Sequence, residues 1–134
     1  MAYYFSTMLI ASFADTVART VDALKAEGFG VITDIDVQKT LQEKIGVTFR
    51  KYRILGACNP KLAHEALALE DKIGTMLPCN VVVQELPDGT VEVAAIDPVA
   101  SMQAINNPQL KQAAAQVAEK LKRVIGQLAV TRGQ

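Results

Sequence analysis

The sequence has two cysteines, Cys58 and Cys79, and one histidine, His64, whose side chains can bind transition metals. Thiolate sulfur and imidazole nitrogen bind zinc and other transition metals, so these residues form a candidate metal site if the fold unites them. The spacing differs from that of a zinc finger, because the sequence has no Cys-x-x-Cys pair. On a helix that begins after Cys58, His64 also falls opposite the apolar face. These cues disfavour a metal site within one chain and leave any metal unknown.

A second chemistry is open to Cys58, because it directly precedes Asn59-Pro60. Asparagine caps helices and proline suits the first helical position, so a helix is expected to begin here. A thiol beside the free N–H groups of a helix start can have a lowered pKa and act as a nucleophile. Free cysteine is also among the residues most often buried, and we favour this interpretation for Cys58. Because both cysteines are expected at strand ends, Cys58, Asn59 and Cys79 are nevertheless the candidate ligand-binding residues.

No residue of the sequence is assigned a catalytic role. A serine or threonine nucleophile needs a general base beside it, and His64 is the one histidine that could act as this base. The candidate nucleophiles Thr75 and Ser101 do not lie near His64 in the sequence. A phosphate-binding loop and a dinucleotide-binding glycine pattern are both absent. Enzyme activity stays open, with a non-catalytic role favoured, and any cofactor is unknown.

The expected outer face of the helix after Asn59 carries His64, Leu67 and Asp71. Leu67 and the neighbouring Ala68 leave an apolar strip on a side that is expected to face solvent. Such strips mark protein contacts or the rim of a pocket. We favour a protein interface, with His64, Leu67 and Asp71 as its candidate residues.

The overall composition excludes several classes of partner. The chain has 134 residues, with 14 Lys and Arg against 14 Asp and Glu, and 50% of its residues are hydrophobic. Zero net charge argues against nucleic acid and against anionic membranes as partners. The sequence predicts neither a signal peptide nor a membrane span, and therefore a cytoplasmic chain with reduced thiols. The length predicts one domain over residues 1–134.

Hydrophobic periodicity and turn residues predict the elements that position these groups. Strands are expected at residues 3–7, 29–36 and 49–58, and a hairpin at 78–98 turns at Pro87-Asp88-Gly89. Helices are expected at residues 12–28, 36–46, 59–74 and 107–128. This order predicts an α+β fold with one mixed sheet and helices mainly on one of its faces.

Three short motifs give the sequence a resemblance to a known family. They are Glu27-Gly28-Phe29-Gly30-Val31, Leu55-Gly56-Ala57-Cys58-Asn59-Pro60 and Leu77-Pro78-Cys79-Asn80-Val81. Over residues 3–98 the chain resembles the bacterial and archaeal family called domain of unknown function 302. The resemblance implies a TBP-like α+β fold (strand, helix, four strands and helix, with short inserted helices) and a tendency to form homodimers. It implies no activity, and it carries over, without roles, Cys58, Asn59, Pro60, His64, Pro78 and Cys79.

Three functional hypotheses follow from these residues. The leading one is a cytoplasmic homodimeric binding module that holds a small apolar or metal-containing ligand between the sheet and the C-terminal helix. Cys58 and Cys79 would line one end of that cleft. The second is a thiol-based redox enzyme or sensor that uses Cys58. The third is a protein–protein interaction module without a small ligand, which recruits another chain through the exposed apolar strip.

Overall fold

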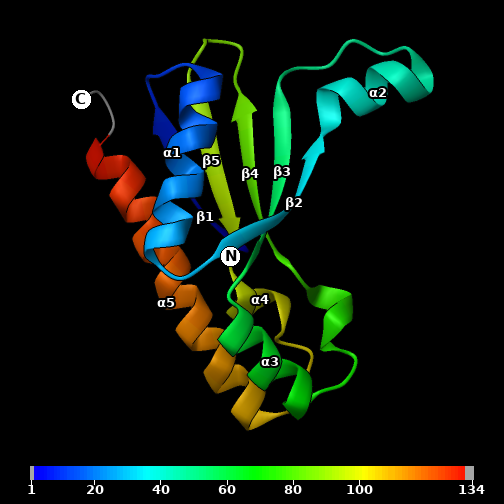
Figure 1. Cartoon of the computed structure of the whole chain (residues 1–134), viewed down its shortest axis with the longest axis vertical. Helices are drawn as coiled ribbons and strands as arrows, with labels where there is room; N and C mark the ends of the chain where they lie inside the picture. Colours follow the sequence, from blue (N-terminus) through cyan, green and yellow to red (C-terminus); the bar gives the residue numbers. More distant parts are fainter. Residues whose placement is uncertain (1, 132–134) are drawn as a thin grey trace.

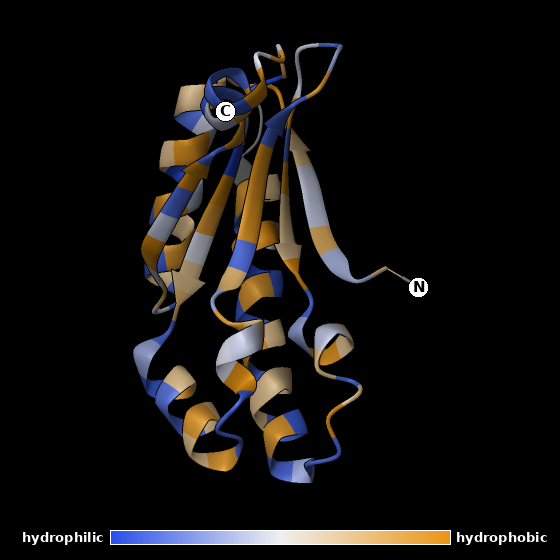
Figure 2. Cartoon of the chain, turned by 90° about the vertical axis from the view of Figure 1, so that its right-hand side faces the viewer, coloured by the Kyte–Doolittle hydropathy of each residue, from blue (hydrophilic) through white to orange (hydrophobic). Residues whose placement is uncertain are grey.

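The structure of the protein, a computed structural model, describes residues 2–131, without the side chains of residues 130 and 131. Its strands form a five-stranded sheet in the order β1-β5-β4-β3-β2, and every neighbouring pair is antiparallel. The strands are β1 (Tyr4–Leu9), β2 (Gly30–Asp36), β3 (Tyr52–Cys58), β4 (Cys79–Glu85) and β5 (Val91–Ile96). Hydrophobic and hydrophilic residues alternate along them (Figure 2), which is typical of a sheet with one buried face.

The helices fall into two groups, those beside the sheet and those beyond its ends (Figure 1). They are α1 (Phe13–Ala26), α2 (Val37–Ile45), α3 (Pro60–Leu69), the 3-10 helix η1 (Ile73–Met76), α4 (Pro98–Ser101) and α5 (Pro108–Thr131). α1 contacts β4 and β5, while α5 contacts β1 and β5, so both cover one face of the sheet. The predicted α+β class is confirmed. The two helices that cover the sheet, α1 and α5, lie on one face, but α2, α3, η1 and α4 lie beyond its ends.

The predicted mixed sheet is wrong, because the sheet is entirely antiparallel. The prediction allowed a helix between two strands to cross a face of the sheet, which produces parallel neighbours. α2 and α3 instead lie beyond opposite ends of the sheet, so the chain turns back after each of them (Figure 1). α1 does cross the face, but it joins β1 and β2, which lie at opposite edges and are not neighbours.

Side-chain caps begin four of the helices, as the sequence predicts. In each case a side-chain oxygen accepts a hydrogen bond from a backbone N–H three residues later, which satisfies a free donor of the helix start. The capping residues, with their donor–acceptor distances, are Ser12 (3.1 Å), Asp36 (3.0 Å), Asn59 (3.2 Å) and Asn107 (3.1 Å).

The helix predicted over residues 59–74 is shorter in the structure. α3 ends at Leu69 because Glu70 adopts an extended backbone (φ −149°, ψ 108°), and Ile73 is buried in the separate helix η1. The apolar side of α3 does not cover the sheet. It contacts α5, and Asn107 Nδ2 donates a hydrogen bond to the Leu69 carbonyl (3.3 Å), which ties the end of α3 to the start of α5.

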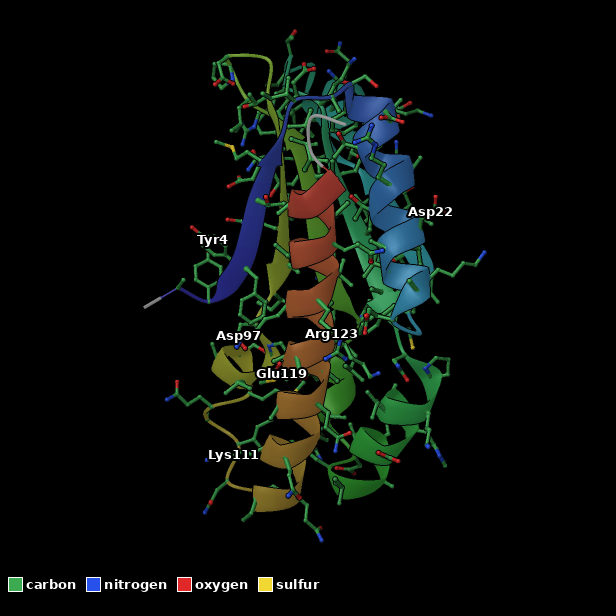
Figure 3. All side chains as sticks on the ribbon, turned by 90° about the vertical axis from the view of Figure 1, so that its left-hand side faces the viewer. Tyr4, Asp22, Asp97, Lys111, Glu119 and Arg123 are labelled. Carbon is green, nitrogen blue, oxygen red and sulfur yellow. The ribbon has the colours of Figure 1, made fainter. Side chains whose placement is uncertain are left out.

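α5 is longer than the sheet and therefore spans two hydrophobic clusters (Figure 3). Its second half packs on the sheet, where Arg123 Nε donates to Glu27 Oε1 beyond the end of α1 (3.0 Å). Its first half packs with α3 and α4 beyond the lower end of the sheet, where β3 ends and β4 begins. This lower cluster comprises Ala66, Ile73, Met102, Leu110 and Ala114. The two clusters meet along α5, and the candidate site lies at their junction.

α2 projects from the opposite end of the sheet, between β2 and β3 (Figure 1). None of its residues is buried, although it has the apolar spacing Val37, Leu41 and Ile45. None of the helices in the described part of the chain has a stretch long and apolar enough to cross a membrane.

Candidate functional site

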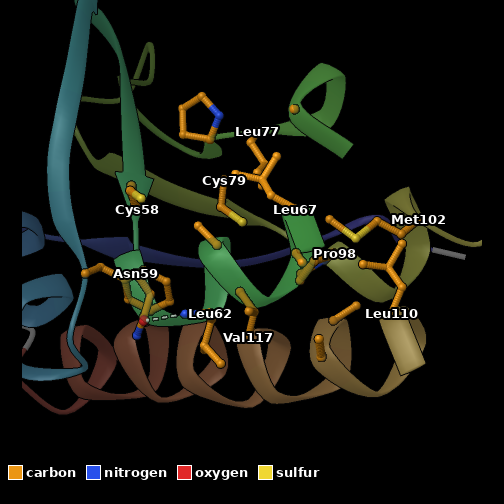
Figure 4. A pocket seen from close by; sticks show the side chains of 18 of the residues that line it. Cys58, Asn59, Leu62, Leu67, Leu77, Cys79, Pro98, Met102, Leu110 and Val117 are labelled. Atoms are coloured by element: carbon orange, nitrogen blue, oxygen red, sulfur yellow. Dashed lines mark hydrogen bonds between the residues drawn. The ribbon is translucent and has the colours of Figure 1, made fainter. Parts of the chain in front are cut away.

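An apolar cavity of about 340 Å³ lies at the junction of the two clusters. Its walls come from the start of β2, from the lower ends of β3 and β4, from α3, η1 and α4, and from the first half of α5 (Figure 4). Leu62 and Ala66 of α3 form one side, while Leu110 and Ala114 of α5 form another. A cavity of this size and composition is typical of a small-molecule site.

Both cysteines line this cavity (Figure 4). Cys58 is the last residue of β3 and Cys79 is the first residue of β4, and the pairing of Ala57 with Cys79 brings the two strand ends together. Both thiols are free. The sequence could name the two residues, but their meeting depends on the antiparallel register of β3 and β4.

The two thiols differ in exposure. Cys58 is half-buried, whereas Cys79 is 8% exposed. Burial, and secondarily the nearby Cys58 thiol, raises the pKa of Cys79 to about 11, since a thiolate is poorly solvated among apolar side chains. Cys79 is therefore protonated and uncharged at neutral pH.

Asn59 lines the cavity, but its carboxamide is occupied. Oδ1 accepts the hydrogen bond from the Leu62 N–H that caps α3 (3.2 Å). Nδ2 lies 3.1 Å from where a side chain on Gly28 would begin, so it is packed against the backbone after α1. The geometry makes Asn59 a structural part of the wall.

Of the three candidate interface residues, only Leu67 lines the cavity. His64 and Asp71 are exposed, and Asp71 Oδ1 accepts a hydrogen bond from Lys72 Nζ (3.4 Å). Leu67 is 43% exposed and also lines the cavity. The described residues contain no group of three His, Cys, Asp or Glu side chains that could hold a metal ion, so His64 does not complete a ligand set with the two thiols.

Gly56 is a site residue that the sequence analysis missed. A Cβ atom on Gly56 would lie 2.0 Å from Thr33 Oγ1 and 2.7 Å from Pro78 Cγ, so both side chains rest directly on its backbone. Pro78 lines the cavity, and Gly56 thus lets the segment before β4 close against the sheet. A glycine inside a strand is a sequence signal for such a close approach.

The cavity wall also includes α5, the C-terminal helix that the sequence already placed beside the cysteines, and the short helix α4, which the sequence did not predict. Pro98, Met102 and Ala114 are buried there, and Ala113 and Ala114 of α5 line the cavity together with the small residues Ala63 and Ala66 of α3. Small residues on facing helices leave space between them, but their spacing in the sequence does not show which helices face each other. None of the residues that line the cavity is charged. The cavity therefore offers no acid–base pair of charged side chains and suits an uncharged, apolar ligand.

This fold and site define a small α+β domain with a thiol-lined apolar cavity at one end of an antiparallel sheet. The sequence profile described as "Domain of unknown function DUF302" matches residues 5–128, and the chain belongs to this family. It is similar to the crystal structure of an uncharacterized conserved DUF302 protein from Bacillus stearothermophilus, with 29% sequence identity and a TM-score of 0.87. The match covers 94% of this chain and 98% of that one. None of the curated proteins matches the sequence.

Proposed function

We propose that this chain is a binding protein for a small apolar ligand, which occupies the cavity beside Cys58 and Cys79. The observation that carries the proposal is the cavity of about 340 Å³ with an uncharged, almost wholly apolar lining. Apolar cavities of this kind gain free energy when an apolar molecule replaces weakly bound water. A metal-containing apolar molecule also fits the proposal, with the two thiols as the soft donors closest to it.

A variant that fills the cavity is expected to abolish ligand binding. Ala66 of α3 is buried and lines the cavity, so Ala66→Phe should place its ring in the ligand's volume. We expect the affinity for a neutral naphthylamine fluorescent probe to fall at least about tenfold. The ring takes up space in which the probe would otherwise bury apolar groups, and each buried methylene contributes about 0.8 kcal/mol to binding. The measurement is a probe titration of the native protein, with elemental analysis and mass spectrometry of co-purified molecules.

Ala68→Phe is the matched control, because Ala68 lies on the same helix and is exposed outside the cavity. This variant should bind the probe like the unmodified chain. A chain that binds no apolar probe, carries no metal and co-purifies with no small molecule would contradict the proposed function.

A thiol-based redox role for Cys58 is the second candidate. It is favoured by the half-buried position of Cys58 on the cavity wall, within reach of a bound molecule. Cys79 is poorly suited to the nucleophilic step, because its raised pKa keeps it protonated. The relative reactivity of the two thiols toward iodoacetamide tests this alternative.

We also propose that the chain is a homodimer and that a second copy covers α2. The support is the unpartnered apolar surface of this projection, which includes Ile35, Ile45 and Val47. A helix of nine residues is marginal alone in water and needs packing to persist. This surface is an alternative to the strip of His64, Leu67 and Asp71, which stays a candidate interface for the same partner or for another protein.

Ile45→Glu is expected to convert the dimer to a monomer. Ile45 is 66% exposed, so a carboxylate there leaves the folded monomer undisturbed but would be buried unpaired in an interface. Light scattering after gel filtration should give twice the chain mass for the unmodified protein and one chain mass for the variant. Gln42→Glu adds the same charge to the same helix at another exposed position, and should stay dimeric if the apolar side forms the contact. A monomeric unmodified chain would overturn this part of the proposal.

We also propose that the fold is TBP-like and that the protein is cytoplasmic. The order strand, helix, four strands and helix, with α2, α3, η1 and α4 inserted, supports a TBP-like classification of the fold. A cytoplasmic location is supported by the two cysteines, which are both free thiols.

A further inference from the structure

Three of the residues that line the cavity are exposed, and together they identify its mouth. They are Ile32 of β2 (62% exposed), Leu67 of α3 and Gly74 of η1. Leu67 Cδ2 lies 4.0 Å from the position of a Cβ on Gly74, so these two residues adjoin each other. All the other lining residues are buried or half-buried. Exposed apolar side chains on a cavity rim are typical of the place where a ligand passes.

The deep end of the cavity lies against α5 and α4. Leu110, Ala114 and Met102 line it there, and all three are buried members of the lower hydrophobic cluster. No charged side chain lines the cavity at either end, and Cys79, which is protonated at neutral pH, adds none. A charged group that entered this end would lose its hydration without gaining a partner.

The volume limits the length of what can be enclosed. An apolar cavity of about 150 Å³ in another protein holds benzene, so the 340 Å³ here admits a considerably longer molecule. At about 30 Å³ for each water-sized group, it admits about eleven heavy atoms. A saturated chain of about ten carbons with one terminal oxygen has this size.

We infer that the ligand is a single apolar chain of about ten carbons, which enters tail first between Ile32 and Leu67 and ends uncharged against Ala114. This inference rests on the proposed function and adds the ligand's shape, its charge and its direction. The polar end of the molecule stays at the mouth, where water solvates it. The inner half lies beside Cys79 and the first turns of α5.

A homologous series of linear alcohols tests the length, by displacement of the neutral naphthylamine probe. We expect affinity to rise about fourfold per methylene and to level off near decan-1-ol, when the chain fills the cavity. Ala114→Leu should move this limit down by about three carbons, since it adds three heavy atoms at the deep end. Ala115→Leu makes the same change at an exposed position of α5 and should leave the limit unchanged.

A comparison of decylamine with 1,10-diaminodecane tests the uncharged inner end. Both have the same chain, but the diamine must bury one ammonium group to insert fully. We expect the diamine to bind at least about a hundredfold more weakly than decylamine at pH 7. Equal binding of the two amines would overturn the inferred direction.

The mouth is tested by the kinetics of probe binding. Leu67→Trp should slow association about tenfold by narrowing the opening, whereas Ala68→Trp on the exposed side should not. If the probe binds and Ala66→Phe blocks it, but neither the length limit nor the association rate responds as described, the inferred ligand is wrong and the binding function stands. If the probe does not bind at all, both fall.

Discussion

Replacing Gly56 by alanine is expected to cost about 3 kcal/mol of unfolding free energy or more, which is a large part of a small domain's stability. The added Cβ would lie 2.0 Å from Thr33 Oγ1 and 2.7 Å from Pro78 Cγ, separations that real Cβ contacts do not adopt. Both neighbours are held in place, Thr33 by the pairing of β2 with β3 and Pro78 by its position next to β4. Urea denaturation followed by circular dichroism measures the change.

Gly30→Ala is the matched control for this prediction. Gly30 lies on β2 beside the same strand, but no atom lies within 4 Å of its Cβ position, so the change should cost less than about 0.5 kcal/mol. The double variant Gly56→Ala, Thr33→Ala should recover part of the loss, because it removes the closest atom but leaves Pro78. Gly56 does not have a positive φ, so its backbone conformation alone would tolerate alanine. A mild effect of Gly56→Ala would therefore contradict the close packing of Thr33 and Pro78 against this residue.

Native Cys58 is expected to react with iodoacetamide at least about a hundredfold faster than Cys79 at pH 8. The thiolate is the reactive form, and a pKa of about 11 leaves about one Cys79 in a thousand deprotonated at this pH. Burial also shields Cys79, whereas Cys58 is half-buried. The Cys79 rate should rise about tenfold per pH unit and level off only near its raised pKa, provided the fold persists. Mass spectrometry of timed samples identifies the modified residue.

Single variants separate the two reactions. Cys58→Ala should lose nearly all rapid labelling at pH 8, while Cys79→Ala should keep it. Labelling in urea should bring both cysteines to similar rates, because unfolding removes the burial that protects Cys79. Equal native rates would contradict the arrangement, and slow labelling of Cys58 in the native chain would also remove the basis of a thiol-based redox role.

The sequence by itself determined most of the local elements and the family of this protein, but neither the break of the 59–74 helix at Glu70 nor the short helix α4. Ser12, Asn59 and Asn107 begin helices as expected, because capping depends on residues only three positions apart. The hairpin of β4 and β5 follows from its valine-rich strands and the turn with Gly89 at φ 88°. The motifs around Cys58 and Cys79 indicated the DUF302 family, which the profile match over residues 5–128 confirms.

Only the tertiary structure decided the site and the strand directions. Periodicity shows which side of an element is apolar, but it does not show which other element covers that side. The antiparallel register of β3 and β4 unites the two thiols, and α5 extends past the sheet to close the cavity with α3. The cavity itself is space left between elements that are distant in sequence. Its volume and mouth therefore depend on how α3, η1 and α5 pack together, which no local pattern specifies.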